Sequence, residues 1–177
     1  MSTKEDRHNL LFSIRRSIRY HNRRRMFFDR LNVVSNALSV IFGSTTFFAL
    51  LPTIGLQYLA IGAAAMVTII STINMVVGSV RTARLHSDLA RRFLELEKRL
   101  AADGPPNKKL LSDIIQERLD IEAEEPPALH VLDAICHNEL MRSMGYKEER
   151  MLRISPLQRS MAQIFDHRRH TIKEINA

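Results

Sequence analysis

The longest feature in the hydrophobicity pattern is the stretch 31–80, which contains no charged side chain. A single helix of that length would measure about 75 Å, whereas about 20 helical residues cross the roughly 30 Å hydrocarbon core of a bilayer. The run Pro52–Gly55 divides the stretch, because proline and glycine interrupt helices. The pattern therefore predicts a hairpin of two membrane-spanning helices, Leu31 to about Leu51 and about Gln57 to Val80.

The alternative explanation is a buried helical hairpin inside a soluble bundle. Helices that face water at the surface of a soluble protein carry a polar stripe with charges. No charge is available for such a stripe between residues 31 and 80. The membrane hairpin is therefore the favoured interpretation.

Apolar residues three and four positions apart predict further helices through the rest of the chain. These helices are expected at about 10–30, 81–102, 107–122, 128–142 and 156–175. The first of them leads directly into the first span, and the second prolongs the second span. Ser155 followed by Pro156 is typical of a helix N-terminus, because serine caps free N–H groups and proline suits the first turn.

No strand pattern is present, so the predicted fold class is all-α, a two-helix transmembrane hairpin with extended helices and a helical cytoplasmic domain. The expected divisions are a basic amphipathic N-terminal helix at 1–30, the transmembrane hairpin at 31–80 and the helical cytoplasmic domain at 81–177.

Charge adds an orientation to this picture. The formal net charge is +7, of which +6 precedes residue 31 and +1 follows residue 80, while the predicted loop between the spans is uncharged. Because basic flanks stay in the cytoplasm, both termini are predicted to be cytoplasmic. The basic N-terminal helix either lies on anionic lipid or packs on the domain behind it. The arginines expected at lipid headgroups are Arg23, Arg24, Arg25, Arg30, Arg81 and Arg84.

Small and polar residues recur at helical spacing along one face of each span. Such residues let helices approach closely and hydrogen-bond in lipid. They either join the two spans to each other or form a face between protomers, where an oligomer could line a pore. The candidate pore or interface residues are Asn32, Asn36, Ser39, Gly43, Thr68, Ser71 and Gly78.

Motifs for enzymatic chemistry are weak throughout. Cys136 and His137 are adjacent on a predicted helix, so their side chains diverge by about 100° and do not form a nucleophile–base pair. His167 and His170 lack a recognisable third metal ligand. The arginine run 23–25 adjoins the membrane and has no interleaved aromatic residues for nucleic acid. We therefore expect no enzyme activity, no catalytic residue, no metal, no cofactor and no nucleic-acid partner.

Two sequence elements resemble a known family. One is Ile18–Phe28, just before the first span, and the other is Pro126–Glu139, in the cytoplasmic part. Together with the two uncharged spans they resemble the SLATT family of bacterial two-transmembrane proteins, over nearly the whole chain. The family-motif residues are Tyr20, His21, Pro126, Pro127, Cys136, Asn138 and Glu139.

The resemblance implies a membrane effector of a bacterial anti-phage or conflict system. Such a protein is expected to oligomerise in the inner membrane and permeabilise it, causing abortive infection. Its partners would be the lipid bilayer, further copies of the chain and a separate nucleotide-signal-producing or nucleotide-sensing protein. The alternative is a non-conducting membrane anchor or scaffold that recruits a cytosolic partner.

Overall fold

The fold is described from a computed structural model, which covers residues 3–44, 57–102, 104, 107–167 and 169–173. These residues form helices and turns with no β-strand, so the predicted all-α class is confirmed. The elements in chain order are α1 (Thr3–Gly43), α3 (Gln57–Val77), α4 (Ser79–Ala102), α5 (Lys108–Ala123), α6 (His130–Ser143), η1 (Glu148–Arg150), α7 (Pro156–Met161) and η2 (Arg169–Thr171). The predicted loop between the spans lies outside the described residues.

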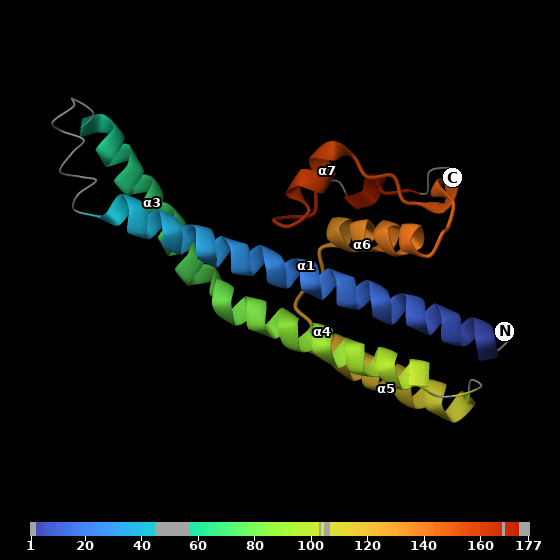
Figure 1. Cartoon of the computed structure of the whole chain (residues 1–177). Coiled ribbons are helices and arrows are strands. Elements are labelled where there is room, and N and C mark those ends of the chain that lie inside the picture. Colours follow the sequence, from blue (N-terminus) through green and yellow to red (C-terminus); the bar gives the residue numbers. More distant parts are fainter. Residues whose placement is uncertain (1–2, 45–56, 103, 105–106, 168, 174–177) are drawn as a thin grey trace. The chain divides into compact units, whose positions relative to one another are not determined.

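The chain divides into two compact units, and α1 and α4 each contribute to both. Unit 1 combines Met1–Arg24 with His86–Ala177, and unit 2 is Arg25–Leu85. In unit 1, α6 and α7 lie on one side of the first part of α1, while α4 and α5 lie on the other (Figure 1). The N-terminal helix therefore packs on the domain formed by the second half of the chain.

Two apolar clusters hold unit 1 together. In the first, α1, α4 and α5 meet through a row of α4 residues spaced four, three and four apart, which places them on one helix face. This cluster consists of Leu10, Ile14, Leu89, Phe93, Leu96, Leu100, Leu111, Ile114 and Ile121. In the second, α6 packs against α1 and the end of α7 through Tyr20, Val131, Leu132, Ile135, Cys136 and Ala162.

The described residues of unit 2 form almost no apolar core of their own. Large apolar side chains on α3 remain exposed, with 66% of Ile61 and 77% of Val76 accessible. Phe28 and Ala60 are among its few buried apolar residues. The soluble-bundle alternative requires these helices to be covered, and the described residues of unit 2 leave α3 largely exposed.

The last predicted helix differs from its predicted length. The expected helix 156–175 begins correctly at Pro156 with a capping box on Ser155, but it ends at Met161. The following segment folds back, and both carboxylate oxygens of Asp166 accept hydrogen bonds from the backbone N–H groups of His130 and Val131. These two groups at the start of α6 have no partner within the helix, so capping α6 competes with extending α7. The prediction of a helix to 175 was therefore wrong.

The predicted continuation of the second span into the cytoplasmic part also has a break. Gly78 separates α3 from α4 and has φ +59°, a left-handed conformation that favours glycine. Its N–H donates to the carbonyls of Asn74 and Met75, and the helical bonding resumes when Thr82 N–H donates to the Gly78 carbonyl. The two helices are thus joined through a single non-helical residue.

Candidate membrane segment and polar contacts

The stretch Tyr58–Val77 of α3 is the one described helix that is long and apolar enough to cross a membrane. It has 20 residues and a mean hydropathy of 2.0, and only 6% of it is buried. At 1.5 Å per residue its length is about 30 Å, which matches a hydrocarbon core. The described helical part of the first predicted span, 31–43, is only about 20 Å long by the same rise.

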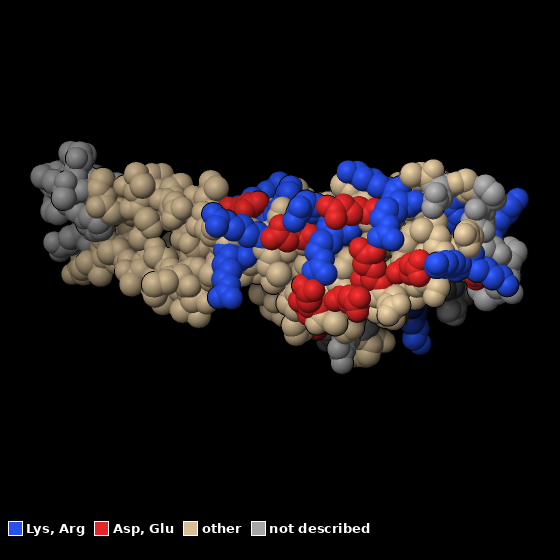
Figure 2. Space-filling view, turned by 90° about the horizontal axis from the view of Figure 1, so that it is seen from below, with Lys and Arg blue, Asp and Glu red and all other residues tan. Residues whose placement is uncertain are grey.

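The surface of unit 2 differs in composition from that of unit 1. In Figure 2 the end of the molecule formed by α3 and the adjoining part of α1 shows neither blue nor red side chains. Lysine, arginine, aspartate and glutamate side chains instead cover much of the remaining surface in this view. This pattern agrees with the uncharged stretch 31–80.

Polar side chains join α1 to α3 inside unit 2. The hydroxyls of Ser39 and Ser71 are 2.9 Å apart, and Asn74 Nδ2 donates to Asn32 Oδ1 at 3.3 Å. The structure thus brings together three of the candidate residues, Asn32, Ser39 and Ser71. Of the two predicted roles, packing between the two helices accounts for these three.

The remaining candidates have other environments. Asn36 is exposed, and its Nδ2 lies 3.5 Å from Asn32 Oδ1, at the limit of a hydrogen bond. The Thr68 hydroxyl donates to the Ala64 carbonyl of its own helix at 2.9 Å. Gly43 ends α1, and no described atom lies within 4 Å of a Cβ added at Gly43 or Gly78. Neither glycine therefore serves a close helix approach among the described residues.

The six arginines expected at lipid headgroups divide between the two units. In unit 1, Arg23 forms an ion pair with Glu139, and Arg24 Nη1 donates to the Gln163 carbonyl at 2.6 Å. Burial lowers the pKa of Arg24. The other four belong to unit 2, where Arg25 is half-buried and Arg30, Arg81 and Arg84 are exposed.

The two family-motif elements meet in unit 1. The Tyr20 hydroxyl accepts a hydrogen bond from Leu129 N–H at 3.0 Å, just after Pro126 and Pro127. Asn138 exchanges two hydrogen bonds with the backbone of Leu152, at 2.7 and 2.8 Å. Motif residues thus act as structural links between α1, α6 and the segment after it.

Cys136 is fully buried on α6. Burial raises the pKa of its thiol from 9.0 to about 12. Because the thiolate is the reactive form, this side chain is poorly suited to nucleophilic chemistry at neutral pH. The structure is consistent with a core role for this residue.

A buried histidine pair on α1 and α4 was not predicted from the sequence pattern. His21 Nδ1 and His86 Nδ1 are 2.9 Å apart, and His21 Nε2 lies 3.0 Å from Glu125 Oε1. The His21 ring also stacks on Phe93, with centroids 5.6 Å apart. His86 precedes Leu89 and Phe93 in the buried row of α4, and this spacing is the signal that could have placed it in the core.

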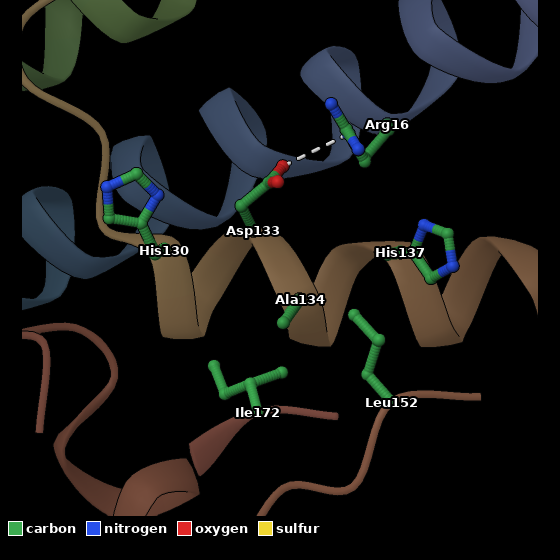
Figure 3. A pocket seen from close by; sticks show the side chains of 7 residues that line it. All are labelled: Arg16, His130, Asp133, Ala134, His137, Leu152 and Ile172. Carbon is green, nitrogen blue, oxygen red and sulfur yellow. Dashed lines mark ion pairs between the residues drawn. The ribbon is translucent and has the colours of Figure 1, made fainter. Parts of the chain in front are cut away.

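A groove runs along one face of α6 in unit 1 (Figure 3). It has a volume of about 610 Å³ and an apolar wall formed by Ala134, Leu152 and Ile172. Its polar groups are His130, His137 and the ion pair of Arg16 Nε with Asp133 Oδ1, at 3.2 Å. Among the described residues, no three histidine, cysteine or carboxylate side chains are close enough to hold a metal ion. The groove could receive a small polar molecule or a side chain of a partner.

Comparisons of this chain with protein-family models, with curated proteins and with solved structures give no match.

Proposed function

We propose that this protein is a membrane effector of a bacterial anti-phage or conflict system that oligomerises in the inner membrane and permeabilises it. The observation that carries the membrane part is α3, whose stretch Tyr58–Val77 is apolar and almost wholly exposed. Each Å² of apolar surface left in water costs roughly 25 cal/mol, so this helix favours a hydrocarbon environment.

A second crossing is supported by how the core of unit 1 is assembled. Leu10 and Ile14 of α1 belong to the same apolar cluster as Leu89 and Phe93 of α4. The chain before and after segment 25–85 must then lie on one side of the membrane, so this segment crosses it an even number of times. In the proposal, Leu31 to about Leu51 is the other span, and the basic flanks keep both termini in the cytoplasm.

Asn36 supports the proposed oligomer. Its amide is exposed on the uncharged part of α1, with one marginal contact to Asn32. An amide in hydrocarbon is costly unless it is hydrogen-bonded or wet. Contact with another protomer, or with water in a pore between protomers, would satisfy it. Thr68 and Thr72 differ, because their hydroxyls already bond to carbonyls of their own helix.

The role in defence rests on the resemblance to the SLATT family. Under this proposal, the activating signal comes from a separate nucleotide-signal-producing or nucleotide-sensing protein. The anchor alternative is favoured by a different observation, the open groove along α6, which offers a cytosolic partner both an ion pair and apolar surface.

The proposal is tested by substituting Asn36 with leucine, which removes the amide and keeps the segment apolar. We expect the wild-type protein to depolarise cells on forced expression and to release dye from liposomes at high protein density. Asn36→Leu is expected to reach the membrane at a similar level and lose the leakage. The matched control is Thr72→Val, which removes a self-bonded hydroxyl from α3 and is expected to leak normally.

Two measurements accompany this comparison. Membrane levels of each variant are quantified, so that poor expression is not mistaken for loss of leakage. Cross-linking in native membranes is expected to show homo-oligomers. A wild-type protein that assembles fully in liposomes but passes neither ions nor dye would refute the pore and favour the anchor.

A further inference from the structure

A cavity lies at the junction of α3 and α4, and the packing of α1 against α3 does not account for it. It has a volume of about 400 Å³ and lies within unit 2. None of the described residues that line it is acidic. Its polar lining consists of Asn32, Asn74, Gly78, Ser79, Arg81 and Arg84.

The backbone at this cavity presents the start of a helix. The bonding of α3 stops with Gly78 N–H and resumes with Thr82 N–H, so Ser79, Val80 and Arg81 form the first turn of α4. The first N–H groups of a helix have no partner within the helix, and they lie at the positive end of its dipole. Such a turn is suited to an anion, particularly a phosphate.

Two buried side-chain atoms at the same place lack partners. Ser79 is only 2% exposed, and neither its Oγ nor Asn74 Oδ1 has a hydrogen-bond partner among the described residues. Buried polar atoms without a partner are uncommon in folded proteins. These two atoms therefore indicate a bound group that supplies a hydrogen-bond acceptor to one and a donor to the other.

Two cations flank the cavity. Arg81 and Arg84 are three residues apart on α4, so they lie on the same helix face. Both are exposed, and neither forms an ion pair with any carboxylate in the described part of the chain. Their charges are thus available to an anionic ligand.

We propose that this cavity binds the phosphate group of an anionic phospholipid. The first turn of α4, the Ser79 hydroxyl and the two guanidinium groups donate to the phosphate oxygens, and Asn74 Oδ1 accepts from a headgroup hydroxyl such as that of glycerol. The cavity directly follows Val77, where the apolar stretch of α3 ends, and the exposed Met75 and Val80 offer apolar contact to the lipid. This inference rests on the proposed membrane insertion of α3.

Lipid binding to the full-length protein in neutral detergent is measured by native mass spectrometry. We expect phosphatidylglycerol to bind about tenfold more tightly than zwitterionic phosphatidylcholine. The double variant Arg81→Gln/Arg84→Gln should lose this preference. The control Arg91→Gln removes another exposed arginine of α4, outside the cavity, and should retain it.

Ser79→Ala distinguishes a ligand site from surface charge alone. Because the Ser79 hydroxyl has no partner without lipid, the variant should melt at the wild-type temperature or higher in lipid-free detergent. Its affinity for phosphatidylglycerol should nevertheless fall by a few fold. Equal affinity of wild type and Ser79→Ala would overturn the assignment of Ser79 as a ligand.

Two further arms separate the possible failures. Inorganic phosphate and glycerol phosphate are titrated as competitors, and displacement of the lipid at equal concentration would assign the cavity to a soluble phosphate instead. Equal binding of the two lipids, or an equal loss in Arg91→Gln, would overturn the site. Carbonate extraction of wild-type membranes tests insertion separately, because release of the protein would refute the membrane proposal. Retention in the membrane together with equal binding of the two lipids would refute only this site.

Discussion

His21 and His86 are distinctive among the individual residues because both imidazoles are buried and their Nδ1 atoms are 2.9 Å apart. A hydrogen bond between two imidazole nitrogens needs one proton, so one ring donates and the other accepts. A second proton would place two cations side by side, with Arg24 also nearby. Burial first, and then these two charges, lower the pKa of His86 from 6.5 to about 4.

This shift predicts that acid destabilises the protein. Because the folded-state pKa of His86 is below its unfolded value, the unfolded chain takes up the proton first. The pKa shift of His86 therefore contributes about 3 kcal/mol to the free energy of unfolding. This contribution is complete above about pH 6.5 and is lost as the pH falls through about 4. His86→Gln should flatten the decline in melting temperature between pH 7 and 4, measured by circular dichroism in detergent. An unchanged pH profile would show that other groups control acid sensitivity.

Cys136 leads to a second prediction, which is simple to measure because it is the sole cysteine of the sequence. Its pKa of about 12, three units above the usual 9.0, lowers the thiolate fraction at pH 8 about a thousandfold, and burial excludes reagents as well. Alkylation with iodoacetamide should therefore be very slow in the native protein and fast after denaturation. Comparable rates in both states would show that the second cluster of unit 1 opens readily.

Secondary-structure elements with a continuous apolar pattern were the most predictable part of the fold. The helices expected at 107–122 and 128–142 correspond to α5 and α6, because their apolar rows meet the core, Asn107 caps the start of α5, and Pro126 and Pro127 separate the two helices. α7 was predicted too long because its apparent periodicity includes Ile164 and Phe165, which are exposed. The competing use of that segment, capping α6 through Asp166, is a tertiary contact that no local pattern reveals.

The contacts between the polar faces of α1 and α3 were also predictable in part. Spacing along each helix placed Asn32, Ser39 and Ser71 on polar faces, and these faces do meet across α1 and α3. Spacing cannot show that Gly78 adopts φ +59°, since a glycine in an apolar run is equally compatible with continuous helix. The cavity beside it depends on that break and was therefore not foreseen.

The break between α3 and α4 predicts different effects of alanine at two glycines. Gly78→Ala places a Cβ in a left-handed conformation and should cost about 1 kcal/mol, although no described atom crowds the site. Gly43→Ala provides the matched control, because Gly43 is helical and equally uncrowded, and alanine favours helix. In the same detergent, the first variant should melt below wild type and the second should not. Equal melting of both variants would contradict the strained conformation at Gly78.

For the molecule as a whole, the assembly of unit 1 constrains topology more strongly than hydropathy does. Hydropathy identifies one described helix long enough to span, and a single span would place the two flanks of α3 on opposite sides. The first cluster of unit 1 instead unites α1, α4 and α5 in one apolar core, using residues from before and after unit 2. A membrane cannot pass between residues that pack against each other, so the proposed insertion of α3 requires a second crossing.

This constraint makes the position of the two termini a decisive measurement. Reporters that are active only in the cytoplasm or only in the periplasm are fused before Met1 and after Ala177 of separate full-length proteins. We expect both ends to report the cytoplasm, because the basic flanks of the hairpin favour that side. An epitope inserted at Thr53, in the predicted connection between the spans, should be accessible from the periplasm of intact cells. Termini on opposite sides of the membrane would indicate that α3 alone crosses and that unit 1 does not assemble from both flanks. An epitope that is protected in intact cells and exposed only after permeabilisation would indicate that neither segment crosses.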